Sequence, residues 1–290
     1  MKKKILVSGS TGQVGQELQF ISNQHPEYIF EFKNRSQLDL SDSESIKNSL
    51  LNSDYDYFIN AAAYTAVDKA ETEINLANAV NAEALQSISA FAPNNCKIIH
   101  ISTDYVYNHN PGRPLEETDQ TLAQNIYAKS KLKGESYLRQ RQNAMTIRTS
   151  WVYSSFGNNF VKTMLRLGKD RDNLSIVADQ IGTPTYARDL ATAIIEIIKF
   201  DQDNSTSFSG VFNYSNMGQT NWADFARKIF ELEGISCQVQ NTTTEAYNAP
   251  AARPLWSVLS KEKIKKKFSI EIPEWDLSLA KCLSEINKGL

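Results

Sequence analysis

The sequence predicts an α/β fold in which helices cover both faces of a doubly wound parallel sheet. Over the first 150 residues, short apolar runs alternate with helix-like stretches, each run ends in small or polar residues, and the first run enters a glycine-rich turn. Strands that alternate with helices are joined by right-handed crossovers, which produce a parallel sheet. The length of 290 residues is near the upper limit for one hydrophobic core. We therefore expect a large domain with a smaller C-terminal lobe.

The expected elements of the large domain follow one another along the chain. Strands are expected at 5–7, 28–32, 57–59, 97–101 and 144–147, and helices at 14–21, 42–52, 71–91 and 124–141. Four of these strands lead into the small or polar sequences Gly-Ser-Thr-Gly, Asn-Ala-Ala-Ala, Ser-Thr-Asp and Arg-Thr-Ser-Trp. In such sheets, ligands bind outside the carboxyl ends of the strands. The pattern therefore predicts one binding site at one edge of the sheet.

The pattern becomes less regular after residue 150, which predicts the smaller lobe. We expect helices near 158–168, 188–200 and 221–233, a strand at 174–177, a turn at 182–185, a loop at 201–209, and then a strand and two C-terminal helices. Residues 1–150, with 170–200 returning to them, form the expected large domain, and 151–169 and 201–290 form the lobe over the carboxyl edge of the sheet. The charged run Lys261–Lys267 predicts a solvated helix face.

The composition excludes several classes of protein. With 41% hydrophobic and 22% charged residues, the chain can bury a core and is not a disordered segment. The net charge of −2 argues against a nucleic-acid partner. The apolar run after Lys2–Lys4 is too short for a secretory signal, and no run approaches the length of a membrane span. Three distant cysteines indicate reduced thiols, and three histidines leave no cluster for a metal. We expect a cytoplasmic protein without a membrane partner.

Three glycines in the first turn, Gly9, Gly12 and Gly15, predict a nucleotide site. Glycines there allow a tight turn, close approach of backbone N–H groups to a pyrophosphate, and close packing of helix on strand. The positive end of the following helix favours phosphate. The same spacing occurs in ordinary turns, but the strand before it and the helix after it favour a dinucleotide-binding Rossmann domain. The spacing differs from the common Gly-x-Gly-x-x-Gly and indicates a variant subgroup.

The choice between NAD and NADP depends on the end of the second strand. An acidic residue there holds a ribose hydroxyl and disfavours NADP. The position of Glu31 is ambiguous, and Arg35 is equally consistent with neutralising a 2′-phosphate and with a solvated loop residue. The sequence slightly favours NADPH and leaves NADH as an accepted alternative.

A tyrosine and a lysine, Tyr127 and Lys131, share one face of the helix expected at 124–141. About one such pair is expected by chance in this composition, so the position of the helix, after the strand that ends in Ser102-Thr103-Asp104, carries the prediction. A nearby ammonium lowers the pKa of a phenol toward neutral pH. Tyr127 is therefore a candidate general acid or base, with Thr103 bonded to the same substrate oxygen. The alternative is a surface tyrosine beside a solvated lysine.

The remaining candidates each have a structural alternative. Asp39 belongs either to the cofactor site or to a turn, and Asp42 is expected to cap the next helix. Asn60–Ala63 offer space for a flat ring or serve tight packing. Trp151 is a wall of the site or a core residue. Arg253 suits a diphosphate, because a guanidinium binds phosphate in a bidentate manner, but it is weak evidence alone.

Together these residues resemble the extended short-chain dehydrogenase/reductase superfamily, and within it the dTDP-4-dehydrorhamnose reductase (RmlD) family. The matching strings are GSTGQVGQEL, NAAAYTAVDKAE, STDYVY, YAKSKLKGE, RTSWVY, GNNFVKTMLR and DQIGTPT. The first and fourth identify only the superfamily, whereas AAAYTAVDKAE and RTSWVY with GNNFVKTMLR are more specific. The resemblance spans essentially the whole chain.

The resemblance implies reduction of the 4-keto group of dTDP-4-dehydro-L-rhamnose by NADPH or NADH, which gives dTDP-L-rhamnose for cell-surface polysaccharide. Tyr127 would donate the proton, Lys131 would hold the nicotinamide ribose and tune Tyr127, and Thr103 would support the substrate oxygen. The implied cofactor residues are Gly9, Gly12, Gln13, Val14, Gly15, Asp39, Leu40, Ala63, Tyr64, Thr65, Tyr127 and Lys131. The implied substrate residues are Thr103, Asp104, Tyr105, Trp151 and Arg253.

The chain also departs from the family pattern. Tyr64 stands where histidine is frequent, and Trp256 replaces an asparagine near the expected nucleotide contacts. Some members bind a divalent cation through glutamates at a dimer contact. Glu17 matches one of them, but Arg188 replaces another, so we expect no metal and leave a homodimer open. A reductase or epimerase for another nucleotide sugar, and a non-catalytic regulatory subunit, are the alternative functions.

Overall fold

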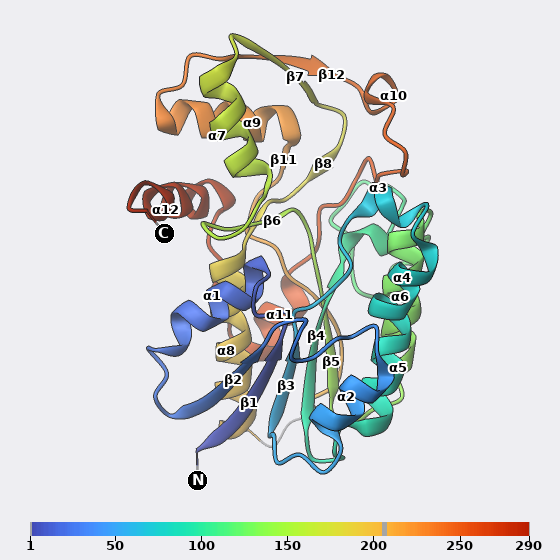
Figure 1. Cartoon of the computed structure of the whole chain (residues 1–290). Coiled ribbons are helices and arrows are strands. Elements are labelled where there is room, and N and C mark those ends of the chain that lie inside the picture. Colours follow the sequence, from blue (N-terminus) through green and yellow to red (C-terminus); the bar gives the residue numbers. More distant parts are fainter. Residues whose placement is uncertain (1, 205–207, 290) are drawn as a thin grey trace.

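A six-stranded parallel sheet forms the centre of the molecule (Figure 1). The computed structural model describes residues 2–204 and 208–289. The sheet order is β2-β1-β3-β4-β5-β10, and every neighbouring pair is parallel. The strands are β1 (Lys3–Ser8), β2 (Tyr28–Lys33), β3 (Tyr57–Asn60), β4 (Lys97–Thr103), β5 (Ala144–Thr149) and β10 (Gly210–Asn213). This order confirms the predicted doubly wound α/β class.

Helices cover both faces of the sheet, as Figure 1 shows. On one face lie α1 (Gln13–Ser22) and α8 (Ala187–Asp203), and on the other lie α2 (Ser43–Leu50), α5 (Ala84–Phe91) and α6 (Ile126–Leu138). The short elements α3 (Val67–Ala70), α4 (Ile74–Asn78) and the π-helical turn Ala79–Glu83 lead into α5. A separate apolar cluster fills each face. Asp42 caps α2 by accepting a hydrogen bond from the Glu44 backbone, as predicted.

A second group of elements lies beyond the carboxyl edge of the sheet (Figure 1). It contains α7 (Phe160–Asp170), β7 (Asn173–Val177), α9 (Trp222–Glu233), β12 (Gln238–Thr242), α10 (Thr244–Tyr247) and α12 (Trp275–Asn287). Strands β7 and β12 pair in parallel, and an aromatic-rich cluster of their neighbours forms its core. The short strands β6 (Val152–Tyr153), β8 (Ile181–Gly182), β9 (Thr185–Tyr186) and β11 (Thr220–Asn221) connect this group to the sheet. Among the described helices, none has the length and apolar character that crossing a membrane requires.

Several expectations for the C-terminal half are wrong or hold only in part. Residues 170–200 were expected to return to the large domain, but β7 pairs with β12 in the second group, because its edge is free to pair there. Strand β10 is an edge strand of the large sheet, and α11 (Glu262–Phe268) packs beside it, although the sequence placed both in the lobe. The lobe sequence carries no signal for this return, because a short strand fits either sheet equally well. Helix α8 extends to Asp203, and residues 205–207 of the predicted loop lie outside the described residues. Lys261 is buried, so the charged run is not wholly solvated.

Helix α6 is fixed to the sheet by a buried ion pair between Glu135 and Arg148. Both Nε and Nη2 of Arg148 donate to the Glu135 carboxylate, at 3.0 and 2.6 Å, and both side chains are almost fully buried. Ser102 on β4 donates to the same carboxylate at 2.7 Å, and Arg148 Nη1 donates to the Tyr107 hydroxyl at 2.7 Å. The pair therefore joins α6 to both β4 and β5.

We expect Arg148→Met to destabilise the fold by about 3–5 kcal/mol, because it leaves the Glu135 carboxylate buried without its partner. Arg139, an exposed second partner of Glu135 at 3.8 Å, provides the matched control. Arg139→Met should change the free energy of unfolding by less than about 1 kcal/mol. Urea unfolding of the three proteins measures the difference. Equal stability of the two variants would contradict this account of α6.

Candidate active site

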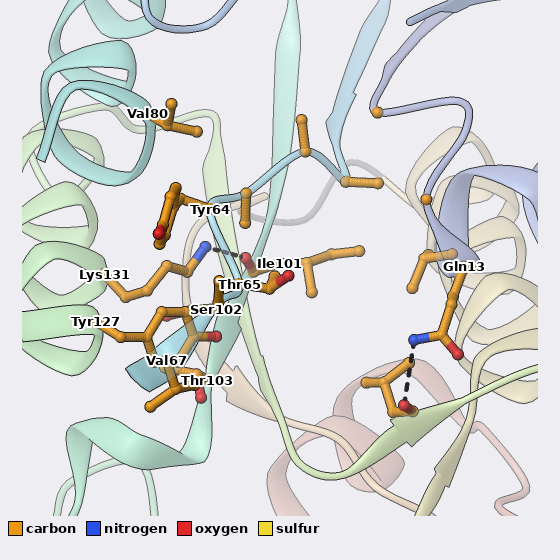
Figure 2. Close-up of a pocket in the computed structure, with 18 of the residues that line it drawn as sticks. Gln13, Tyr64, Thr65, Val67, Val80, Ile101, Ser102, Thr103, Tyr127 and Lys131 are labelled. Carbon is orange, nitrogen blue, oxygen red and sulfur yellow. Dashed lines mark hydrogen bonds between the residues drawn. The ribbon is translucent and has the colours of Figure 1, made fainter. Parts of the chain in front are cut away.

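One cleft of about 940 Å³ opens at the carboxyl edge of the sheet, where the sequence predicted a site. This volume is large enough for a dinucleotide and part of a second ligand. It is lined by residues from the ends of β1, β3, β4 and β5, from α1 and α6, and from Trp222 on α9 (Figures 1 and 2). The predicted residues in its wall are Gly9, Gly12, Gln13, Val14, Asp39, Leu40, Ala63, Tyr64, Thr65, Thr103, Asp104, Tyr105, Tyr127, Lys131 and Trp151.

The glycine turn lies at the point where the sheet order reverses, between β1 and β3. Gly9 has φ +73°, and a Cβ there would lie 2.7 Å from the Ala62 backbone in the turn after β3. Gly15 is outside the cleft wall, and a Cβ on it would lie 2.1 Å from the Gly9 carbonyl oxygen. Two of the predicted glycines thus allow backbone packing that brings α1 to the cleft.

The N-terminus of α1 fits a phosphate group. Its N-cap is Gly12, which has no side chain to accept the free backbone N–H groups, and its first turn has no acidic residue. Gln13, the first residue of α1, donates from its side chain to the Val152 carbonyl at 3.3 Å (Figure 2). The N–H groups and the positive helix end are therefore available to an anion in the cleft.

The end of β2 provides an arginine and an aspartate to the cleft. Arg35 is exposed, and its Nε lies 3.4 Å from Asp39 Oδ2. Asp39 also accepts hydrogen bonds from the backbone and hydroxyl of Ser41. Glu31 contacts Tyr55 and Lys33 and is not in the cleft wall. Arg35, rather than Glu31, is therefore the charged residue of β2's end that faces the cofactor side of the cleft.

The turn after β3 is held by Asn81 in the π-helical segment. Asn81 Oδ1 accepts from the Tyr64 backbone N–H at 2.9 Å, and its Nδ2 donates to the Tyr64 carbonyl at 3.0 Å. The same Nδ2 lies 3.1 Å from the Ser130 hydroxyl on α6. This one amide connects the predicted cofactor turn Ala63–Thr65 to the helix that carries Tyr127 and Lys131.

Tyr127 lies in the first turn of α6, which Asn125 caps by accepting from the Ala128 N–H at 2.7 Å. Its ring lies beside Thr103, the last residue of β4 (Figure 2). Burial raises the pKa of Tyr127 to about 12, and the Thr103 hydroxyl partly offsets this increase. The phenol is therefore protonated at neutral pH and suited to donate its proton.

Lys131 lies one turn further along α6 and is buried. Its Nζ donates to the Ile101 carbonyl oxygen at 2.7 Å (Figure 2). The same Nζ lies 3.3 Å from Nε2 of His100. Burial lowers the pKa of Lys131 to about 7. The expectation that its ammonium lowers the pKa of Tyr127 is wrong for this structure, because Lys131 faces β4 and burial dominates at the phenol.

A buried carboxyl group, Asp104, follows Thr103 directly. The Thr103 hydroxyl donates to Asp104 Oδ1 at 3.1 Å, and burial raises the pKa of Asp104 to about 7. The ring of Tyr105 meets the Tyr127 ring edge-on at 5.8 Å between centroids. These side chains form the floor of the cleft next to the phenol.

Trp151 and Trp222 form the opposite wall. Their rings stack at 3.7 Å between centroids with an interplanar angle of 12°. Trp151 has φ +48°, in the left-handed region that is strained for residues other than glycine. A Cβ on Gly182 would lie 2.8 Å from the Trp151 ring. The absence of a side chain at Gly182 therefore leaves room for the indole. The sequence identified Trp151 but not its partner.

Arg253 is outside the cleft wall, although the sequence predicted a ligand contact. Its Nη2 donates to Asp68 Oδ2 at 2.8 Å. Trp256 also lies outside the wall and donates from Nε1 to the Arg113 carbonyl at 3.2 Å. Arg188, another residue that departs from the family pattern, forms two ion pairs. Its Nε lies 2.7 Å from Glu17 Oε2, and its Nη1 lies 3.0 Å from Glu285 Oε2.

Sequence reasoning missed the polar side chains beneath the cleft. Asn60, His100 and Glu135 are fully buried. His100 contacts Lys131, Asn60 contacts His100, and Glu135 lies on the helix that carries the lysine. A polar residue within an otherwise apolar buried strand was the available signal for Asn60 and His100. Glu135 had no such signal, because a glutamate on a helix is usually exposed.

This combination defines the class of the protein. A doubly wound sheet that presents an uncapped helix N-terminus, a half-buried Tyr127, and the buried side chains of Lys131 and Thr103 in one cleft is typical of a nicotinamide-dependent oxidoreductase of the short-chain dehydrogenase/reductase type.

Comparison with known proteins gives the particular family. A family model described as the RmlD substrate binding domain matches residues 2–288. The chain is 37% identical over 292 residues to the dTDP-4-dehydrorhamnose reductase of Escherichia coli K12, covering 97% of each chain. It is 35% identical to the spore coat polysaccharide biosynthesis protein SpsK of Bacillus subtilis, again over 97% of each. A crystal structure of dTDP-4-dehydrorhamnose reductase from Bacillus anthracis in complex with NADP superposes with a TM-score of 0.91 at 34% identity, covering 98% of this chain and 100% of that one. The chain belongs to the dTDP-4-dehydrorhamnose reductase family.

The buried lysine predicts a characteristic dependence of stability on pH. The pKa of Lys131 is about 7 in the folded chain and 10.5 for an ordinary lysine, so the unfolded chain binds more protons between these values. Folding stability attributable to Lys131 therefore rises with pH from about 7 to about 10 and is flat below 7. Wild-type minus Lys131→Met unfolding free energies, from urea titrations at pH 6, 8 and 9.5, should increase across the series. Parallel curves for the two proteins would show that the lysine is not desolvated.

Proposed function

We propose that Tyr127, Lys131 and Thr103 perform in this chain the reaction of its family, reduction of the 4-keto group of dTDP-4-dehydro-L-rhamnose to dTDP-L-rhamnose. The observation that carries the proposal is the half-buried, protonated Tyr127 beside Thr103 in a cleft that also contains the uncapped N-terminus of α1. One cleft thus offers a proton donor and a phosphate-binding helix end, which a nicotinamide-dependent ketone reductase requires.

Reduction of the ketone needs one hydride at C4 and one proton at the C4 oxygen. NADPH supplies the hydride when it is bound. Tyr127 supplies the proton, because burial keeps its phenol protonated at neutral pH. The Thr103 hydroxyl beside it is placed to hold the same oxygen. Proton transfer leaves a phenolate on Tyr127. Lys131, one turn further along α6, would hold the nicotinamide ribose of the bound cofactor through its amine.

NADPH fits the residues of the cofactor side. The N–H groups at Gly12–Val14 would hold the diphosphate, and the turn Ala63–Thr65 would contact the nicotinamide end. Arg35 is available for a 2′-phosphate, because it is exposed in the cleft wall and its contact with Asp39 is long. NADH lacks this phosphate and remains the second cofactor of the proposal.

The sugar nucleotide is assigned to the Tyr105 and Trp151 side of the cleft. Asp104 and Tyr105 adjoin the phenol, and the Trp151–Trp222 stack offers a flat wall from the second group of elements. This group is the proposed substrate-binding lobe. Arg253 contacts the diphosphate only after leaving Asp68, so its role is the weakest of those assigned.

Other parts of the prediction keep the status of proposals. A homodimer and a cytoplasmic location are proposed on the sequence alone. Trp256 was the reason to consider a different nucleotide sugar, but it contacts Arg113 away from the cleft and favours no other substrate. The full Tyr127, Lys131 and Thr103 set favours an enzyme over a regulatory subunit.

Tyr127→Phe should lower turnover of dTDP-4-dehydro-L-rhamnose by about 10²–10⁴-fold, because the proton donor is lost. NADPH oxidation, followed by its near-ultraviolet absorbance, measures the effect. Tyr137→Phe, at another tyrosine of α6, is the matched control and should retain normal turnover. Near wild-type turnover in Tyr127→Phe would falsify the assignment of the proton donor.

Arg35→Ala should raise the KM for NADPH about tenfold, a loss of about 1.4 kcal/mol, and leave the KM for NADH unchanged. Lys33→Ala removes an equal charge from the end of β2 outside the cleft wall and serves as the control. Steady-state kinetics with both cofactors gives the ratio. An equal effect on NADPH and NADH would refute a contact between Arg35 and the 2′-phosphate.

A further inference from the structure

A buried chain of polar side chains runs from the first strand to Lys131. The Ser8 hydroxyl donates to Asn60 Oδ1 at 2.8 Å, Asn60 Nδ2 lies 3.1 Å from His100 Nδ1, and His100 Nε2 lies 3.3 Å from Lys131 Nζ. All four side chains are at most 1% exposed. This series of side chains crosses β1, β3, β4 and α6 beneath the cleft. Of its four residues, the reaction described above uses only Lys131.

The hydrogen bonds of Asn60 fix its orientation. Its Oδ1 accepts from both the Ser8 hydroxyl and the Ala62 backbone N–H, at 2.8 and 3.3 Å. The amide nitrogen therefore points to His100 and donates to Nδ1. Burial and the neighbouring Lys131 lower the pKa of His100 well below its ordinary value, so the imidazole is neutral. A neutral imidazole that accepts at Nδ1 carries its hydrogen on Nε2, which faces Lys131.

The other charged groups near Lys131 do not bind its amine. Glu135, one turn further along α6, is bound by Arg148 from β5, and Tyr127, one turn before, lies beside Thr103. Within residues 2–204 and 208–289, Lys131 Nζ forms hydrogen bonds with the Ile101 carbonyl oxygen and with His100. The imidazole is thus the one titratable group in hydrogen-bond contact with the amine within these ranges.

We propose that His100 is a positioning residue for the reaction: oriented by Asn60, it presents its Nε2–H to Lys131 and so controls how readily this lysine takes up a proton. The neutral amine accepts this hydrogen bond. The protonated amine of Lys131 can only donate hydrogen bonds, so it requires an Nε2 of His100 that carries a lone pair and no hydrogen. Uptake of one proton from water by Lys131 therefore moves the imidazole hydrogen to Nδ1 and turns the Asn60 amide over, which breaks the bond from Ala62. The effect on catalysis rests on the proposed function, whereas the tautomer of His100 can be measured independently of that function.

The tautomer is tested directly by ¹⁵N NMR of the ligand-free protein labelled at histidine. The chain has three histidines, His25, His100 and His109, so the His100 signals are assignable by comparison with His100→Gln. Above pH 8 we expect a protonated Nε2 and an unprotonated Nδ1 at His100. A protonated Nδ1 under these conditions would overturn the proposal whether or not the protein turns over any sugar nucleotide.

Asn60→Asp tests the consequence for the lysine. A carboxylate keeps the Ser8 and Ala62 bonds but accepts from His100, so the imidazole hydrogen moves to Nδ1 and Nε2 accepts from an ammonium. We expect the decline of kcat at alkaline pH to occur about one pH unit higher in Asn60→Asp than in the wild type. At a pH above the midpoint of the wild-type decline, this shift makes kcat of the variant about tenfold larger. The KM for the sugar nucleotide should be unchanged. The NMR spectrum of the variant should show the Nδ1–H tautomer even if turnover is lost.

The added negative charge of Asn60→Asp needs its own control. His100→Leu removes the imidazole, and the double variant retains only the through-space effect of the carboxylate. We expect Asn60→Asp to shift the alkaline limb by much less in the His100→Leu background, and likewise in His100→Gln if the leucine variant does not fold. An equal shift with and without the imidazole would show that charge alone acts and would refute the relay through His100.

Discussion

The buried pair of Glu135 and Arg148 determines where the proposed catalytic side chains, Tyr127 and Lys131, stand relative to the sheet. Helix α6 carries Tyr127 and Lys131 on the turns before Glu135, so the anchoring of that carboxylate to β4 and β5 sets their height above the strand ends. Removing two charges from water costs more than their attraction returns unless every donor and acceptor is satisfied. Ser102 and the Tyr107 hydroxyl complete this set. The pair therefore specifies the position of one helix more than it adds stability.

The same helix is joined to the cofactor side of the cleft through backbone packing. A Cβ on Gly134 would lie 2.1 Å from the Asn81 carbonyl oxygen, so this glycine allows α6 and the π-helical turn to approach closely. The Asn81 side chain then bonds Tyr64 and Ser130 at once. The predicted cofactor turn is thus held to α6 by direct hydrogen bonds. The π-helical turn is consistent with the frequent use of such irregular helix at functional sites.

Two ionisable groups in the cleft wall are buried at a cost to folding stability. The low pKa of Lys131 and the raised pKa of Asp104 both follow from burial, which disfavours the charged form of each group. A surface lysine and a surface aspartate would contribute more to stability. In the proposed reaction, burial of the groups around the phenol would exclude water from the proton transfer and strengthen the electrostatic contacts that remain. Functional sites commonly keep such locally unfavourable groups.

The sequence by itself determined the parallel sheet and the edge at which the site lies, because apolar periodicity and the residues after each strand are local features. Fifteen of the predicted residues are in the cleft wall, and several of them, such as Leu40 and Tyr64, were implied by the family resemblance. The tertiary structure decided the rest. It placed β10 in the large sheet, paired Arg253 with Asp68, and faced Lys131 toward His100. These contacts join residues from 31 to 185 positions apart, and the pairing of strands and the desolvation of buried charges depend on the packed fold, not on neighbours in the chain.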